Sequence, residues 1–419
     1  NKSLYDAYIK AFRWSTDRLD PKNGGIIAFI SNGNWLDGNG MDGFRSCLQK
    51  EFTNIYVLNL RGNARTQGEL RRKEAGNVFG MGTRTNVSIT ILVKNPVSIN
   101  ESAKIQYFDI GDYLTKNEKL QILKVKRSFV NLLDSSICLE PNKYGDWLKH
   151  RNDIFETFNP LEPDKKFDSN SNSFFSLNSL GVNTNRDSWS YNSDRNKLVD
   201  KMHQMVSVYN KQVKLYSLNK DKSISVTELI ENDEKKIKWS SSLISNLERL
   251  NVAKFEKDRV LVSMYRPFFK QFLYFGDKMI HRRGQFEEIF PEPNVTNLML
   301  CVSGLGGTKE NSVVLTNCIT DLNFLDAGTQ CFPLYYFVKN DTINRSLFDS
   351  DSDNLQLKYS RKDGITNFVL KQAIDLYGKK VAKEDIFYYI YGILNNNEYR
   401  SRFANDLKKM FPRVPLLDE

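Results

Sequence analysis

The chain has 419 residues, too many for one ordinary domain, and this length predicts two or three. Lysine and arginine total 60 against 50 acidic residues, which gives a formal charge of +10 and a pI near 9.1. That balance favours an anionic partner, although a generally basic surface would look the same. No apolar run approaches the roughly 20 residues of a membrane helix and no signal region opens the chain, so we expect a cytoplasmic protein without membrane contact.

The five cysteines lie far apart without a Cys-x-x-Cys pair, and the three histidines are equally scattered. This spacing supplies neither a zinc ligand set nor a disulfide framework. We therefore expect no metal site, and we interpret the cysteines as buried thiols.

The chain opens on an amphipathic helix. Apolar residues from Leu4 to Phe12 recur at spacings of three and four, with Ser3 as a possible N-cap, and the helix is expected to reach about Leu19. After a short turn, Gly25 to Ile30 forms a continuous apolar run. Such a run is typical of a parallel strand covered on both faces, so we expect a central strand.

The next segments have the order of a βαβ unit. The polar loop Ser31 to Leu36 follows the first strand, Met41 to Phe52 has helical spacing, and Ile55 to Leu60 is a second strand. Ligands of such units bind beyond the carboxyl ends of the strands. The loop Ser31 to Leu36 occupies that position.

A long basic stretch leads from the second strand to a third at Asn86 to Val93. A connection of this length is uncommon unless it is functional or disordered. Contact with a phosphate backbone is one interpretation, and a solvated mobile loop is the other. The basic residues of this stretch are Arg61, Arg65, Arg71, Arg72, Lys73 and Arg84.

Several of these segments together resemble the adenine methyltransferase of type I single-polypeptide (type ISP) restriction-modification enzymes. They are 4–14, 30–37, 59–63 and 87–96. In that family a helicase-nuclease, a gamma-class methyltransferase and a target recognition domain share one chain. The resemblance implies an α/β fold: the C-terminal half of a Rossmann-like methyltransferase sheet, then an α+β target recognition domain.

The motifs of the methyl transfer itself are missing. The family uses an Asn/Asp-Pro-Pro-aromatic motif, but Asn95-Pro96 and Asn159-Pro160 lack the second proline and the aromatic residue. Gly304 to Gly307 has no βαβ setting for a cofactor. We therefore expect a fragment without catalytic residues, inactive alone, with S-adenosylmethionine bound mainly upstream and ATP and Mg used only by the motor and nuclease of the parent polypeptide.

One element of the adenine pocket is expected to remain. In gamma-class enzymes an aromatic residue before the late strand stacks on the extruded adenine, and Phe79 matches that place. The alternative is a core phenylalanine, because most of the 27 phenylalanines must be buried. Trp35 and Asn32, on the loop after the first strand, are weaker pocket candidates.

The organisation changes in the middle of the chain. Ile105 to Asp109 is a short strand, and Thr115 with Glu118 forms a capping box for a helix to about Val125. Regular patterning then weakens, so we place a boundary near Glu140. The expected parts are 1–140 for the methyltransferase, 141–380 for target recognition and 381–419 for a C-terminal helical pair that packs on it.

The second part contains four motifs that resemble the target recognition region of the same family: 184–192, 265–268, 280–283 and 330–335. Most of them place planar or cationic donors beside aromatic residues, which suits contact with base edges and phosphates of a double-stranded, asymmetric DNA target. The alternative is that the aromatics are core and the arginines pair with acids. The DNA-contact candidates are Arg186, Arg266, His281, Arg282 and Arg283.

The leading interpretation is thus part of a site-specific DNA adenine methyltransferase. A non-catalytic specificity module that only binds DNA is the rival. A nuclease is the third class, but its acid and lysine types occur only in the run 233–238, which we interpret as a solvated charge cluster.

Overall fold

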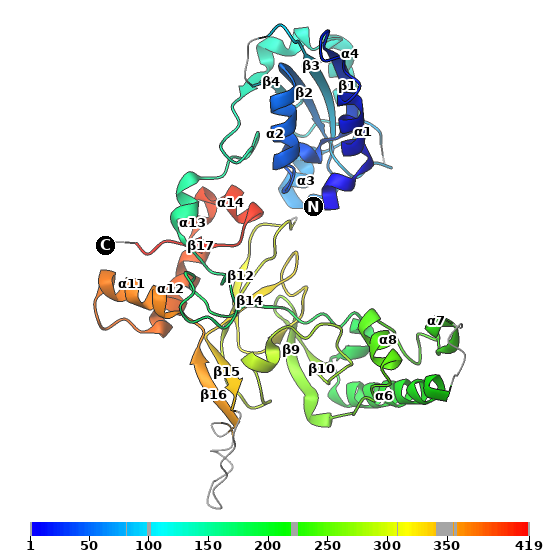
Figure 1. Cartoon of the computed structure of the whole chain (residues 1–419), viewed down its shortest axis with the longest axis vertical. Coiled ribbons are helices and arrows are strands. Elements are labelled where there is room, and N and C mark those ends of the chain that lie inside the picture. Colours follow the sequence, from blue (N-terminus) through cyan, green and yellow to red (C-terminus); the bar gives the residue numbers. More distant parts are fainter. Residues whose placement is uncertain are drawn as a thin grey trace, which may run out of the picture. The chain divides into compact units, whose positions relative to one another are not determined.

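The computed structural model describes residues 2–80, 82–98, 102–218, 225–307, 309–340, 355 and 358–417. The chain divides into two compact units, Asn1–Asp153 and Ile154–Glu419 (Figure 1). The break lies downstream of the expected Glu140, because residues 141–153 belong to the first unit. None of the described sheets contains strands of both units.

The first unit is built on a five-stranded sheet of order β1-β3-β2-β4-β5. Its strands are β1 (Gly25–Asn32), β2 (Asn54–Arg61), β3 (Val87–Lys94), β4 (Lys104–Asp109) and β5 (Ile137–Leu139). Strand β3 pairs antiparallel with both β1 and β2, so these two run in the same direction, as a βαβ unit requires. They are not neighbours, because β3 lies between them.

The expectation of a central first strand is wrong for the described sheet. Strand β1 lies at its edge, hydrogen-bonded only to β3 among the described strands. Ile26 and Ile30 on β1 are 67% and 60% exposed, whereas Ile27 is buried. The continuous apolar run therefore has one covered and one open face here.

Helices cover the two faces of this sheet. Alternate residues of β2 enter different cores: Ile55 and Val57 pack with α1 and α2, and Leu58 and Leu60 pack toward α4. The helices of the first unit are η1 (Lys2–Tyr5), α1 (Ala7–Thr16), η2 (Gly33–Leu36), α2 (Asp42–Glu51), α3 (Gly68–Glu74), α4 (Lys116–Lys126) and η3 (Val130–Ser135).

The ends of these helices test the capping predictions. The capping box of α4 is confirmed, since Thr115 and Glu118 bond reciprocally across its first turn. The first α-helix is shorter than expected: it begins after Asp6 and ends at Thr16, with a separate 3-10 turn before it. Residues 17–19 continue into a turn.

The second unit contains two four-stranded sheets, of order β13-β9-β10-β8 and β12-β11-β14-β7, and two strand pairs, β15-β16 and β17-β6. The strands are β6 (Asn159–Pro160), β7 (Ser179–Leu180), β8 (Tyr191–Asn192), β9 (Val260–Arg266), β10 (Phe269–Tyr274), β11 (Met299–Val302), β12 (Val313–Thr316), β13 (Ile319–Thr320), β14 (Gln330–Pro333), β15 (Tyr335–Lys339), β16 (Tyr359–Asp363) and β17 (Arg413–Val414).

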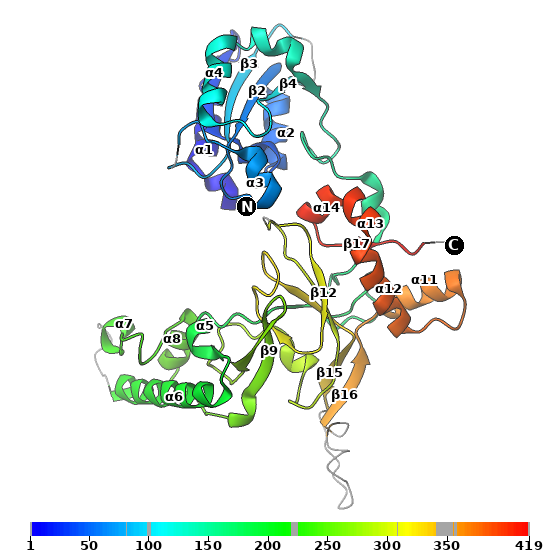
Figure 2. The ribbon, with the colours of Figure 1, turned by 180° about the vertical axis from the view of Figure 1, so that it is seen from behind.

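Its helices gather in two groups on opposite sides of the sheets (Figures 1 and 2). One group contains α6 (Arg195–Leu218), α7 (Val226–Leu229) and α8 (Ser241–Glu248), and the other contains α11 (Asn367–Tyr377), α12 (Lys383–Asn395), α13 (Asn397–Arg402) and α14 (Ala404–Lys409). The short helices η4 (Asp153–Thr157), α5 (Asp187–Ser190), η5 (Lys257–Arg259) and α9 (Phe286–Ile289) complete the unit.

The C-terminal helices share one core with the sheets of the second unit. Ile390, Phe403 and Leu407 cluster with Phe175 of the segment after β6 and with Phe332 of β14. Residues 381–419 are therefore an integral layer of the second unit, and α11, which the sequence analysis did not predict, belongs to the same layer.

The cysteines are all free, as expected, but not all buried. Cys301 and Cys331 face each other across β11 and β14 with 3.7 Å between their sulfur atoms, whereas Cys47 and Cys138 are exposed. In the described part of the chain, no helix has both the length and the apolar character needed to cross a bilayer.

Candidate functional site

Phe79 lies on an ordered loop of the first unit. Its ring is 60% exposed, so the core interpretation of this phenylalanine does not apply. The Asn77 side chain fixes the loop: its amide nitrogen donates to the carbonyl oxygens of Gly62 (3.1 Å) and Thr85 (2.8 Å), and its oxygen accepts from the Phe79 amide (3.0 Å). The loop is thereby tied to the residues next to the end of β2 and the start of β3.

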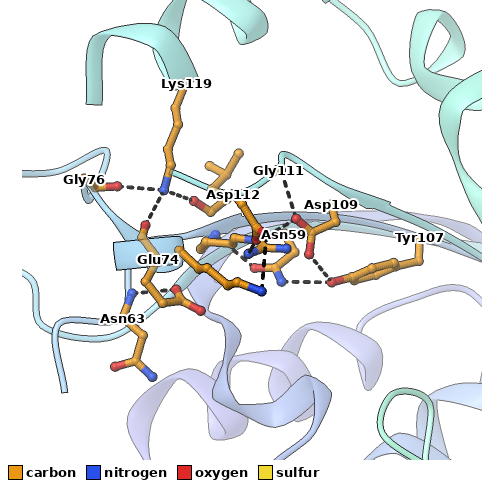
Figure 3. A network of polar contacts seen from close by, with 12 residues as sticks. Asn59, Asn63, Glu74, Gly76, Tyr107, Asp109, Gly111, Asp112 and Lys119 are labelled. Atoms are coloured by element: carbon orange, nitrogen blue, oxygen red, sulfur yellow. Dashed lines mark hydrogen bonds and ion pairs between the residues drawn. The ribbon is translucent and has the colours of Figure 1, made fainter. Parts of the chain in front are cut away.

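A buried lysine donates hydrogen bonds to the main chain of the same loop and of its borders. Lys119 of α4 is fully buried, and its ammonium group donates to the carbonyl oxygens of Leu60 (2.9 Å), Glu74 (2.9 Å) and Gly76 (2.7 Å), as Figure 3 shows for the labelled residues. Burial lowers the pKa of Lys119. These three acceptors compensate for the lost hydration of the ammonium group.

A second network of hydrogen bonds and ion pairs joins the carboxyl ends of β2 and β4. Arg61 donates to Asp109 (2.6 Å) and also pairs with Asp112. The hydroxyl of Tyr107 accepts from Asn59 (2.9 Å) and donates to Asp109 (3.1 Å) (Figure 3). The guanidinium of Arg61 is therefore engaged with two carboxylates, and its role as a DNA contact stays a prediction.

The other two pocket candidates differ from Phe79. Trp35 is completely buried and packs against Phe12, Phe44 and Trp147, so its ring is part of the core and presents no face to a base. That prediction is wrong for the described conformation, because the loop after β1 folds inward as η2. Asn32 caps η2 by accepting from the amide of Asn34 (2.9 Å) and stays partly exposed at the end of β1.

The remaining cations of the basic stretch divide into engaged and open side chains. Arg71 donates to the carbonyl oxygen of Ala75 (2.7 Å) at the end of α3, and Arg72 pairs with Glu69 at 3.3 Å on the exposed face of that helix. Arg65 and Arg84 are exposed. In its described residues the stretch surrounds α3, and both interpretations of it stay open.

Lys116 is a further cation near Phe79. It is exposed at the first position of α4, and a Cβ placed on Gly80 would lie 3.6 Å from its ammonium nitrogen. A lysine in the first turn opposes the helix dipole, so this position does not serve helix stability. The ammonium group lies beside the residue that follows Phe79.

In the second unit, Arg186 has a structural role. It is 1% exposed, and its guanidinium donates to the carbonyl oxygens of Lys238 (3.1 Å) and Met279 and to the hydroxyl of Ser240. Burial lowers its pKa to about 10. In the described conformation the side chain is therefore enclosed and committed to Lys238, Met279 and Ser240, which does not favour its predicted contact with DNA.

Arg266 is held rigidly but remains partly exposed. It pairs with the buried Asp321 at 2.7 Å, lies 3.8 Å from Asp187, and stacks over the ring of Tyr265 at 3.9 Å. Burial raises the pKa of Asp321 despite the neighbouring arginine. A guanidinium fixed in this way keeps part of its donor edge free for a planar acceptor.

The motif 280–283 contains three different environments. His281 is half-buried and bonds Ser242 through Nδ1 (3.0 Å), and burial, followed by the charges of Arg282 and Arg186, lowers its pKa. Arg283 pairs with Glu287 at 2.9 Å and donates to the carbonyl oxygen of Phe275. Arg282 alone among these three has an exposed side chain.

Arg282 lines a cavity of about 280 Å³ together with Leu180 of β7 and Gln330 of β14. Planar amides and a second cation lie around it, including Asn178, Asn183, Gln330 and Lys166. Such groups match the donor and acceptor pattern of base edges. Among the described residues, no three His, Cys, Asp or Glu side chains come together to hold a metal ion.

Two residues of these sites, Lys119 and Lys116, were not among the predicted site residues. Lys119 and Lys116 resemble ordinary solvated helix lysines in the sequence. Phe268 belongs to the motif 265–268, and the alternative that its aromatic residues are core does not hold for it, because it is 94% exposed. The proline before it was the available signal, since Pro-X is a turn pattern.

Comparisons with known proteins agree with this geometry. A model of the type ISP C-terminal specificity domain matches residues 173–419. Among solved structures, the chain is similar to the type ISP restriction-modification enzyme LlaGI, in complex with a DNA substrate mimic, with 34% identity and a TM-score of 0.76 over 99% of this chain and 30% of that chain.

Two further structures are similar over 99% of this chain. The ATP-dependent type ISP enzyme LlaBIII bound to DNA has 32% identity and a TM-score of 0.79, with 25% of its chain covered. A DrdV–DNA complex has 30% identity and a TM-score of 0.78, with 38% covered. No curated protein matches the sequence. The chain thus spans between a quarter and two fifths of these three proteins.

The fold and its sites define a mixed α/β protein with the architecture of type ISP specificity regions. The chain belongs to the type ISP restriction-modification family, and residues 173–419 form its C-terminal specificity domain.

Proposed function

We propose that the chain is part of a site-specific DNA N6-adenine methyltransferase. Its first unit supplies part of the pocket for the extruded adenine, and its second unit reads an asymmetric duplex target. The observation that carries the proposal is the open ring of Phe79 on a loop that Asn77 and Lys119 hold in place.

The energetics of base extrusion support a stacking role for Phe79. Adenine N6 is paired inside the duplex, so the base must leave the stack before a methyl group can reach it, at a cost of a few kcal/mol. Stacking on an aromatic ring returns roughly 1 to 3 kcal/mol per base. The ring must be exposed to provide this energy, and Phe79 is exposed on a loop whose backbone bonds the Asn77 side chain.

Sequence reading is assigned to the second unit on the basis of its open polar groups. The planar donors belong to Arg282, to the amides around its cavity and to the fixed guanidinium of Arg266. Not every donor of these groups is used in a hydrogen bond within the protein. LlaGI, LlaBIII and DrdV, with which the chain shares its fold, are described in complexes with DNA or a DNA mimic. We extend DNA as a partner to this chain on that similarity.

The described residues do not fit the cofactor of the reaction. Gly304 to Gly307 lies between β11 and β12, which pair antiparallel, and not between a strand and a helix as a dinucleotide-type loop requires. We therefore propose that S-adenosylmethionine is bound mainly by another part of the full-length polypeptide. ATP and Mg would serve its motor and nuclease.

The test uses the full-length polypeptide, its target mapped from N6-methyladenine in plasmid DNA of expressing cells. Phe79→Ala should slow methylation about tenfold or more, the equivalent of about 1.4 kcal/mol, with near-normal target binding and folding. Phe79→Trp and Phe79→Tyr should be milder. If Phe79→Ala methylates DNA at the parental rate, or if this variant unfolds, then Phe79 is not part of the adenine pocket.

The match of the family model to residues 173–419 alone favours a second candidate, a specificity module that only binds DNA. The same experiment separates the two. A full-length polypeptide that binds one duplex sequence selectively, but leaves no N6-methyladenine in it, would establish the binding module and contradict the methyltransferase.

A further inference from the structure

The turn between β9 and β10 presents an aromatic side chain to solvent. Arg266 and Phe269 pair across the hairpin, with Pro267 and Phe268 as the two turn residues. Phe268 is 94% exposed, the highest value among the exposed large hydrophobic side chains described. An apolar ring in this position contributes nothing to the core.

The backbone at this residue is also unfavourable. Phe268 has a φ of +61°, in the left-handed region that bulky residues avoid. Pro267 fixes a negative φ at the first central position, and the pair has the sequence of signs of a type II turn, which strongly favours glycine or asparagine at the second position. A phenylalanine kept there at an energetic cost indicates a function for the ring.

The hairpin is a rigid support for this ring. Strand β10 pairs with β9 from Phe269 to Tyr274, and β9 is held on its other side by β13. At the base of the turn, Arg266 is fixed by Asp321, whose backbone amide donates to Met264 of β9 (2.9 Å). The tip is therefore positioned by three strands and by an ion pair whose carboxylate is buried.

The chemistry at the tip suits duplex DNA. The apolar pair Pro267–Phe268 is flanked by the cations Arg266 and Lys270, and Lys270 is exposed. Phenylalanine and proline wedges between cationic side chains are how proteins open a base step, with the cations on the adjacent phosphates. A single ring and a proline offer far less than the roughly 800 Å² per partner of a standard protein interface.

We propose that Phe268 is a wedge that inserts between two base pairs of the target duplex and unstacks them. This rests on the proposed function, because it requires the second unit to bind duplex DNA. It adds a residue and a role beyond base reading: the hairpin distorts the duplex, and the distortion energy contributes to selection of the site.

The experiment uses the full-length polypeptide and target duplexes in which 2-aminopurine replaces one base at a time, outside the target adenine. The parental protein should raise the fluorescence at one step. Phe268→Ala and Phe268→Gly should abolish that signal and weaken target binding about tenfold, in line with the stacking value of one ring. Phe268→Trp should keep the signal.

Two controls make the outcome specific. Leu218→Ala, at another exposed apolar side chain of the same unit, should leave both readouts unchanged. Phe268→Gly should raise the melting temperature, because glycine relieves the positive φ. If the parental protein binds its target and Phe268→Ala changes neither signal nor affinity, or lowers affinity with the signal intact, the wedge is wrong. Failure of the parental protein to bind any duplex selectively would instead contradict the proposed function.

Discussion

Lys119 and Gly76 are joined by a hydrogen bond of 2.7 Å between ammonium and main-chain carbonyl, across 43 positions of sequence. The same ammonium donates to the carbonyl oxygens of Leu60 and Glu74, so all three of its protons are used on the main chain of the Phe79 loop and its borders. The side chain of Lys119 thus supplies the kind of hydrogen bonds to carbonyl groups that main-chain amides supply in helices and strands.

Lys119→Met should lower the free energy of unfolding by about 2 to 4 kcal/mol, because a similar volume is kept while three buried acceptors lose their donor. Amide hydrogen exchange should become faster in residues 74–80 in particular. Lys124→Met, an exposed position of the same helix, is the matched control and should change neither quantity. Equal protection of the loop in both variants would show that Lys119 does not hold it.

Lys116→Ala should reduce the salt dependence of DNA binding. If the exposed ammonium beside Gly80 contacts one phosphate, its loss should lower the slope of log K against log [salt] by about 0.9 and weaken target and scrambled duplexes alike. Lys124→Ala should leave the slope unchanged. If Lys116→Ala keeps the parental slope of log K against log [salt], the ammonium group of Lys116 does not contact DNA.

Arg186 and Arg282 should separate stability from DNA affinity. Arg186→Met removes a buried guanidinium with three acceptors and should lower the free energy of unfolding by roughly 3 kcal/mol. Arg282→Ala should leave thermal stability within about 0.5 kcal/mol, as surface substitutions do, and weaken target binding more than scrambled binding. Unfolding is measured by denaturant titration and binding by fluorescence anisotropy, and the opposite pattern would reverse both assignments.

His281 should make stability fall with acidification. Its folded pKa lies below the usual 6.5, so the unfolded state binds more protons in the window between the two values. Stability is fully present above 6.5, falls as pH drops through that window, and the loss is complete below the folded pKa. His281→Gln should flatten this part of the stability profile, measured by denaturant titration across the pH range.

Local patterns in the sequence predicted local structure well. The capping box of Thr115 and Glu118, the strand Ile55–Leu60 and the helix from Lys383 depend on neighbours within a few positions. The place of β1 in its sheet depends on β3, which begins 55 residues after β1 ends (from Asn32 to Val87), and no local pattern carries that information.

The candidate site shows the same division. Arg186 and Phe268 lie in motifs of the same kind, yet one is enclosed and the other open, because partners 52 and 93 positions away surround Arg186. Phe79 was predicted from a family position, and its loop is held by Asn77, whose acceptors Gly62 and Thr85 lie at the two ends of the connection between β2 and β3. Burial of arginine and exposure of phenylalanine both run against average preference, so composition could not foresee them.

The open face and edge of β1 bear on the behaviour of the isolated chain in solution. From Gly25 to Asn32, the strand presents main-chain donors and acceptors on the side away from β3, next to two exposed isoleucines. An edge of this kind is a template for pairing with a second copy, so concentrated preparations should self-associate and precipitate. Ile26→Lys or Ile30→Lys would place a charge on the open face beside that edge and should reduce this self-association.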